Sequence, residues 1–97
     1  MNTADTPTLN EVRSVIDAID QQIVSLIAER QRCVLTAGSL KKDEDGVRAP
    51  ARVEQVIEKA RALADAAGAS PEVVESTYRA MISAFIRLEL AQHRSGY

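Results

Sequence analysis

The sequence predicts an all-α protein with three helices, of which the first is very long, assembled as an intertwined homodimeric helical bundle. Three observations lead to this fold class. Apolar residues recur with a helical period of about 3.6 residues along most of the chain, without strand-like alternation. Helix start and stop residues divide that pattern into three segments. The first segment is also too long for a compact domain of 97 residues to cover.

The first helix is predicted to begin at Thr8-Leu9-Asn10-Glu11, a capping box in which the Thr8 hydroxyl and the Glu11 carboxylate satisfy each other's backbone amides. Residues 1–7 are expected to form a flexible N-terminal tail, and residues 8–97 a single domain. The helical pattern continues to about Lys41, interrupted only by Gly38, which costs about 1 kcal/mol relative to alanine. Such a helix spans roughly 50 Å, whereas a compact chain of this size has a radius of gyration of about 13 Å. A second copy is therefore expected to cover its far half.

The segment KKDEDGVRAP, residues 41–50, is predicted to be a solvated loop, because its acids lack the alternating spacing of a calcium loop. A second helix is expected from Pro50 to Ala67, with Gly68 as its stop. Ser70 and Pro71 then supply an N-cap and a first-turn proline. They start a third helix that reaches about His93.

Composition excludes several classes of protein. With 45% hydrophobic residues, 27% charged residues and a net charge of −2, the chain is neither disordered nor a polycation, so no nucleic-acid partner is expected. The single cysteine cannot form an internal disulfide. Neither a signal peptide nor an apolar run long enough to span a membrane is found. These features predict a cytoplasmic protein without a membrane partner.

Charged residues fall on the faces that the helices should bury. Arg30 and Lys41 lie within the apolar stripe of the first helix, Arg52 at the margin of the second, and Glu89 within that of the third. Three cations against one acid favour a bound anion, because an uncompensated buried charge costs several kcal/mol. We therefore predict a small-molecule ligand with carboxylates. The structural alternative is an ion pair of Arg30 with Glu89 or with an acid from a partner chain, with Lys41 reaching solvent at a frayed helix end.

Metal, cofactor or nucleophilic chemistry finds little support in the sequence. The only histidine, His93, is expected to be exposed near the C-terminus. No second metal ligand accompanies Cys33, and no glycine-rich phosphate loop is present. No cofactor and no metal are expected, and the chemistry should depend on positioned charges.

Three runs of the sequence resemble the all-helical class of chorismate mutases, from Leu9 to Arg94. They are VRSVIDAIDQQIVSLIAERQRCVLTAGSLKK, VRAPARVEQVI and YRAMISAFIRLEL. An early arginine, a second arginine seventeen residues later and a lysine eleven further on match the family at Arg13, Arg30 and Lys41. Arg52 matches the arginine that opens the second helix, and Glu89 stands where the family has glutamine.

The resemblance implies an interlocked homodimer with two shared active sites, each completed by Arg13 of the other chain. It implies that chorismate rearranges to prephenate without a proton transfer or a nucleophile. Substrate carboxylates would be bound by Arg13, Arg30 and Arg52. Catalysis would rest on Lys41, Glu89 and Arg30, with Lys41 donating to the ether oxygen as negative charge develops there. Glu89 could donate as well only when protonated, and the sequence leaves its protonation open.

One departure from the family pattern indicates a second candidate activity. Many mutases of this class carry an acidic pair that engages the ring hydroxyl of the substrate, and the matching positions here are Ala49 and Val53. The Ala-Pro-x-Arg-Val pattern is similar to the related isochorismate pyruvate lyases, which form salicylate and pyruvate. A mutase is ranked first and a lyase second, with dual activity as an option. A non-enzymatic helical dimerisation module, with purely structural inward charges, is the alternative from another class.

Overall fold

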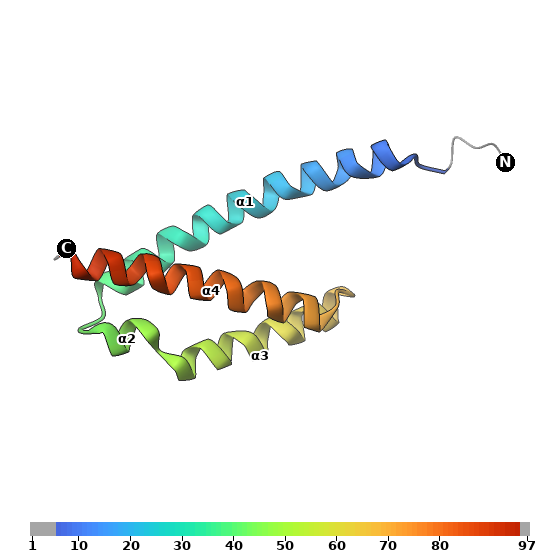
Figure 1. Ribbon diagram of the computed structural model, residues 1–97. Coiled ribbons are helices and arrows are strands. Elements are labelled where there is room, and N and C mark those ends of the chain that lie inside the picture. Colours follow the sequence, from blue (N-terminus) through green and yellow to red (C-terminus); the bar gives the residue numbers. More distant parts are fainter. Residues whose placement is uncertain (1–5, 96–97) are drawn as a thin grey trace. The chain divides into compact units, whose positions relative to one another are not determined.

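A computed structural model describes residues 6–95 and is all-α, as the sequence predicts (Figure 1). The residues 1–5 of the expected tail lie outside the described residues. The chain forms one long, one very short and two intermediate helices: α1 (Leu9–Ser39), α2 (Glu44–Arg48), α3 (Pro50–Ala67) and α4 (Pro71–Arg94). The prediction of a very long first helix is confirmed, since α1 has 31 residues and is about 46 Å long at the usual rise per residue.

Two compact units divide the chain, Met1–Cys33 and Val34–Tyr97. Among the described residues, the first unit holds most of α1. The second holds the last turns of α1 together with α2, α3 and α4. Each unit is described by itself.

The N-terminus of α1 is fixed by the predicted capping box. The amide of Glu11 donates to Thr8 Oγ1 at 3.1 Å, and the amide of Thr8 donates to Glu11 Oε1 at 3.0 Å. The backbone hydrogen bond from Thr8, followed by the side-chain hydrogen bond, lowers the pKa of Glu11. Two amides that the helix itself leaves without acceptors are thereby satisfied.

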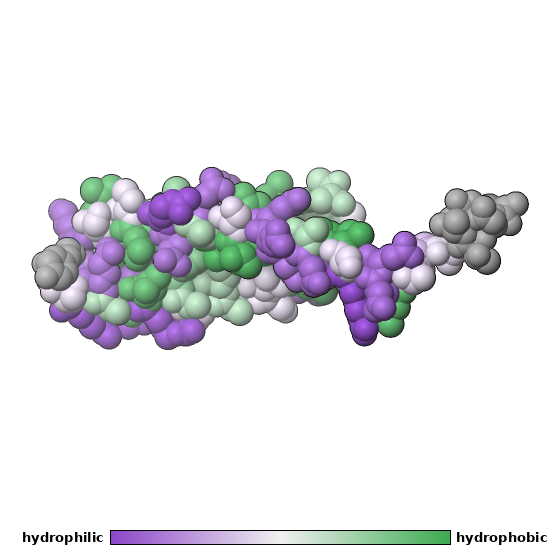
Figure 2. Space-filling model, turned by 90° about the horizontal axis from the view of Figure 1, so that it is seen from above, coloured by the Kyte–Doolittle hydropathy of each residue, from purple (hydrophilic) through white to green (hydrophobic). Residues whose placement is uncertain are grey.

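The apolar side chains of the first unit are exposed in the single chain. A lone helical segment has nothing of its own against which to bury an apolar stripe. Figure 2 shows such hydrophobic residues at the surface among hydrophilic ones. Nine large side chains of α1 are between 37% and 64% exposed: Leu9, Val12, Val15, Ile16, Ile19, Ile23, Val24, Leu26 and Ile27.

In the second unit, α3 and α4 lie side by side, and α2 packs against α4 (Figure 1). Their packing produces the buried apolar core of the chain: Val47, Ile57, Ala60, Ala64, Ile82, Phe85 and Leu90. The predicted boundaries of α3 are confirmed, because it begins at Pro50 and ends before Gly68, which has the left-handed φ of 80°. The predicted start of α4 is also confirmed, since the Ser70 side chain accepts from the Val73 amide at 3.3 Å.

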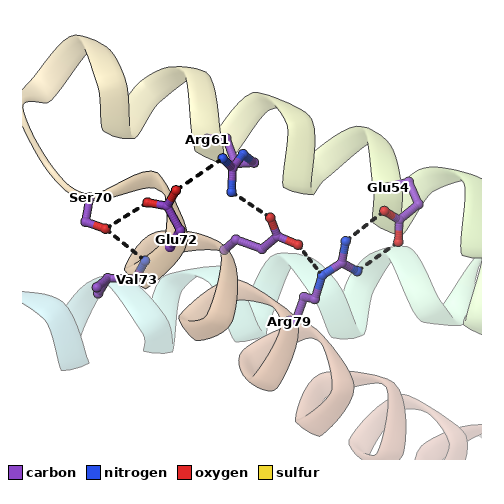
Figure 3. Close-up of polar contacts among 7 residues, drawn as sticks. Glu54, Arg61, Ser70, Glu72, Val73 and Arg79 are labelled. Atoms are coloured by element: carbon purple, nitrogen blue, oxygen red, sulfur yellow. Dashed lines mark hydrogen bonds and ion pairs between the residues drawn. The ribbon is translucent and has the colours of Figure 1, made fainter.

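A network of ion pairs crosses the outer face of the α3–α4 hairpin (Figure 3). Both terminal nitrogens of Arg79 donate to Glu54, each at 2.8 Å, while its Nε donates to Glu75 at 2.7 Å. Arg61 donates to Glu75 as well, at 2.8 Å. These hydrogen bonds lower the pKa values of both glutamates, that of Glu54 through Arg79 and that of Glu75 through Arg79 first and Arg61 second. The arginines thus tie α3 to α4.

The prediction of a solvated loop over residues 41–50 is wrong in its middle, where the one-turn helix α2 forms. The Asp43 side chain accepts from the Gly46 amide at 2.8 Å and caps this helix. Acids at a helix start are favourable because they face the positive end of the helix dipole. A helix of 5 residues is too short to show an apolar period, which is why the sequence pattern missed it. The helix α1 also ends at Ser39, two residues before the predicted Lys41.

Candidate active site

Lys41 and Glu89, two of the predicted catalytic residues, are in contact in the second unit. Lys41 Nζ lies 3.0 Å from Glu89 Oε2. The Glu89 side chain is only 6% exposed, whereas that of Lys41 is 30% exposed. A buried carboxylate is tolerated when a cation pairs with it. The contact therefore explains how the acid can lie on the inner face of α4 and leaves the ammonium partly accessible.

Gly38 lies against the same carboxyl group, one turn before Lys41. It lies in the last turn of α1 and is the buried residue of that helix among the described residues. A Cβ at this position would lie 2.8 Å from Glu89 Oε2 and 3.3 Å from Glu89 Cγ. The sequence marked Gly38 only as a weak point of the helix. Its role in close packing depends on a residue 51 positions away, which no local pattern reveals.

The last residues of α4 form hydrogen bonds with residues before, at and after Lys41. Gln92 Nε2 donates to the carbonyl oxygen of Leu35 at 3.3 Å. His93 Nε2 lies 3.2 Å from the carbonyl oxygen of Lys41, and because a carbonyl can only accept, this nitrogen carries the hydrogen. Arg94 forms two hydrogen bonds with the Glu44 carboxylate, of 2.8 and 2.9 Å, and its side-chain hydrogen bond lowers the pKa of Glu44.

The expectation that His93 is simply exposed is wrong, because it is half-buried and contacts Lys41. One signal in the sequence could have indicated this. His93 follows Glu89 by four residues, so the two side chains share a face of α4. The same face therefore contacts both the side chain and the main chain of Lys41.

The start of α3 carries the remaining predicted site residues of the second unit. Arg52 is exposed, and its Nη1 donates to Gln55 Oε1 on the same helix. Ala49 and Val53 are half-buried, and neither side chain can hydrogen bond. Ala49 has a left-handed φ of 35°, a conformation in which a residue with a Cβ is strained. It serves as both the end of α2 and the N-cap of α3.

Arg13 and Arg30 belong to the first unit, on α1. At 100° per residue, their directions from the helix axis differ by about 100°. By this spacing, Arg30 falls within the apolar stripe of α1, and Arg13 falls outside its edge. The structure thus joins Lys41 to Glu89, while the arginine clamp of Arg13, Arg30 and Arg52 stays a prediction.

Within residues 6–95 no group of three or more histidine, cysteine or acidic side chains is arranged to hold a metal ion. Over the same range, no helix has the length and apolar character needed to cross a membrane.

Comparison with known families identifies the family to which the chain belongs. The sequence profile described as chorismate mutase type II matches residues 12–90, most of the chain. The chain belongs to the chorismate mutase type II family. Among curated proteins, none matches the chain. The resemblance on which the site prediction rests is therefore confirmed at the level of the family. In this member of the chorismate mutase type II family, the matched range includes the early arginine Arg13 and the contacting pair Lys41 and Glu89.

Proposed function

We propose that the protein is a chorismate mutase, which converts chorismate to prephenate. The observation that carries this proposal is the contact between the Lys41 ammonium and the buried Glu89 carboxyl group, in a chain of the chorismate mutase type II family. A partly exposed ammonium held by an inner carboxyl group is suited to polarise a ligand atom in a confined site.

The reaction is intramolecular. The ether C–O bond breaks while a C–C bond forms between the enolpyruvyl arm and the ring, and no proton or nucleophile enters. Negative charge grows on the ether oxygen in the transition state, so a hydrogen-bond donor there lowers the barrier. An ammonium has three donor hydrogens. Lys41 can therefore keep its 3.0 Å contact with Glu89 and still donate to the ether oxygen.

Glu89 can act as a second donor in this proposal only when it is protonated. An ionised carboxylate only accepts hydrogen bonds, whereas the protonated form has one donor. The protonated Glu89 would donate to the same ether oxygen as Lys41. Arg30 and Arg52 would bind the two carboxylates of the substrate in the folded, reactive shape, a contribution of orientation that can reach several kcal/mol.

We further propose that the active form is a homodimer with two shared sites. The large apolar side chains on α1, such as Ile19, Ile23 and Ile27, are exposed in the single chain. A second copy of the same helix offers a matching apolar stripe, and burial of each such side chain contributes about 1.5–3 kcal/mol. In this arrangement the partner subunit's Arg13 completes each site.

An isochorismate pyruvate lyase is the second candidate function. The half-buried Ala49 and Val53 favour it, because a site without a polar partner for the ring hydroxyl does not select its position. Isochorismate carries this hydroxyl on a different carbon. In the lyase reaction a ring hydrogen moves to the enolpyruvyl arm as the ether C–O bond breaks, giving salicylate and pyruvate in equal amounts.

The test is to assay the purified protein against chorismate and isochorismate side by side, together with two matched variants. Lys41→Ala should lose about 100- to 1,000-fold in kcat, as expected for removal of a transition-state donor. The neighbouring Lys42→Ala, at an exposed position, should retain wild-type turnover. Equal losses in both variants would contradict the role of Lys41.

The same assay separates the enzymes from a non-enzymatic dimerisation module. Such a module would turn over neither compound and would not be stabilised by a dicarboxylate. An enzyme ligand present at 100 times its Kd would raise the free energy of unfolding by about 2.7 kcal/mol.

A further inference from the structure

Gly38 meets the carboxyl end of Glu89 at a distance that leaves no room for a Cβ unless the Glu89 side chain shifts. A Cβ there would lie 2.8 Å from Oε2, the oxygen that contacts Lys41, and 3.4 Å from the carboxyl carbon. Real Cβ atoms do not approach an oxygen this closely, so one of the two groups would have to move. The carboxyl group is the free end of a flexible side chain, whereas Gly38 is fixed in the last turn of α1.

We propose that Gly38 is a positioning residue, which reserves the space in which the Glu89 carboxyl group reaches Lys41. The inference rests on the proposed function, in which both residues act on the ether oxygen. Gly38 itself touches no substrate. It acts through Glu89, because any side chain at position 38 displaces the oxygen that lies 3.0 Å from Lys41 Nζ.

A purely structural glycine would behave differently. Gly38 has no left-handed backbone conformation, since the positive φ values among the described residues belong to Ala49 and Gly68. Alanine is moreover the better helix former. Gly38→Ala should consequently stay folded and lose far more activity than stability. Its loss of stability should not exceed that of Lys41→Ala, because both changes separate the Glu89 carboxyl group from the ammonium. A loss of activity out of proportion to the loss of stability is the signature of positioning.

The experiment compares Gly38→Ala with Ser39→Ala, a control that places the same alanine at the next position of α1, where the residue is exposed. The Ser39 hydroxyl donates only to the carbonyl oxygen of Thr36 on its own helix, at 2.7 Å. Gly38→Ala should lower kcat on the order of 100-fold, the effect of misplacing a reacting group by about 1 Å. KM should change little, because the arginines that bind the substrate carboxylates are untouched. Ser39→Ala should have the kcat of the wild type. Unchanged kcat in Gly38→Ala, or an unfolded variant, would overturn the proposal.

A double-mutant cycle shows whether the effect passes through Glu89. In a Glu89→Ala background the space beside position 38 is open, so Gly38→Ala should have no further effect on kcat. The same fold-loss in both backgrounds would mean that Gly38 acts by another route, and would overturn the proposal.

Crystal structures of the wild type and of Gly38→Ala separate this inference from the proposed function. If neither chorismate nor isochorismate reacts, the proposed function fails, and the structures alone decide the positioning. The carboxyl group of Glu89 should then be displaced from Lys41 Nζ in the variant while α1 and α4 keep their places. A preserved contact near 3.0 Å, with a shifted helix instead, would overturn it.

Discussion

The imidazole Nε2 of His93 lies 3.2 Å from the main-chain carbonyl oxygen of Lys41, four residues along α4 from the acid that contacts the Lys41 side chain. One face of α4 thus holds both the backbone and the ammonium of the same lysine. Because Lys41 follows the end of α1 rather than lying inside it, its backbone gains order from this contact.

His93→Ala should therefore loosen the segment that carries Lys41. Loss of one hydrogen bond to a main-chain carbonyl costs about 1 kcal/mol of stability, to be measured by urea unfolding, and kcat should fall because the ammonium is less well placed. His93→Gln is the matched control, since its amide nitrogen can donate from a similar position. If glutamine restores neither stability nor kcat, the hydrogen bond is not what matters at this position.

A charge on the apolar stripe of α1 should prevent dimer formation. Ile23→Glu would place a carboxylate where the proposed second copy packs, at a cost of several kcal/mol unless it is paired. Sedimentation at low micromolar concentration should give twice the chain mass for the wild type and a monomer or an unfolded chain for the variant. Ser25→Glu is the control, because residue 25 points to nearly the opposite side of the helix. A folded, active wild-type monomer would contradict the shared site.

The hairpin of α3 and α4 should lose stability in acid through Glu75. Hydrogen bonds from Arg79 and then Arg61 lower the pKa of this carboxyl group in the folded state. Its stabilisation is thus complete above the unfolded value near 4.5 and is lost as the pH falls through the lower folded value. Glu75→Gln should be less stable than wild type at pH 7, with the difference shrinking toward about pH 3. Urea unfolding across this range measures it.

Glu58→Gln on the same helix pair is the control for the acid experiment, because Glu58 is exposed. It should change stability little at any pH. Salt should also weaken the Glu75 effect, since the network is exposed to solvent. A Glu75→Gln difference that stays constant between pH 7 and 3 would show that the ion pairs are not its source.

Removal of Lys41 should leave a buried carboxyl group without its cation. Glu89 is 6% exposed, so Lys41→Ala should destabilise the protein by about 2 kcal/mol, reduced by the partial exposure of the lysine. Lys41→Ala combined with Glu89→Gln should recover part of this loss, because a neutral amide needs no counter-charge. Thermal unfolding of the two single variants and the double variant measures the coupling. Simple additivity would mean that the ion pair contributes nothing.

Much of this fold could be predicted because its determinants are local. The capping box of Thr8 and Glu11, the prolines at helix starts and the stop at Gly68 each act within a few residues. The helix α2 was missed because a single turn has no apolar period. Lys41 and Glu89 are predicted as site residues because charges stand out on apolar faces, and the family resemblance names the same positions. The structure adds that the two side chains are in contact.

The rest depended on contacts between distant residues. Nothing near Gly38 in the sequence indicates that Glu89 lies beside it, and His93 looks like an exposed C-terminal residue until α4 is packed. Residues that are close in the sequence therefore predict the helices. The roles of Gly38 and His93 depend instead on contacts with residues that are far away in the sequence.

Replacement of Glu89 by glutamine should show whether catalysis needs a hydrogen-bond donor at this position. The contact with Lys41 at 3.0 Å is that of an ion pair when the carboxyl group is ionised, and in that form Glu89 cannot donate to the ether oxygen. An ionised Glu89 would also repel the negative charge that grows there in the transition state. A side chain that always carries a donor should therefore support catalysis at least as well as the glutamate.

Glu89→Gln supplies such a donor at nearly the same volume, so its kcat/KM should equal or exceed that of the wild type. Glu89→Ala is the control, because it has no donor at all, and its kcat/KM should fall well below that of both proteins. Ionic strength must be held constant, because screening of the arginines by salt weakens substrate binding and would imitate a change at Glu89. An inactive Glu89→Gln would mean that Glu89 does not act as a donor. Its role would then be that of an ionised partner that holds Lys41 in place, and Glu89→Gln would lose stability together with activity.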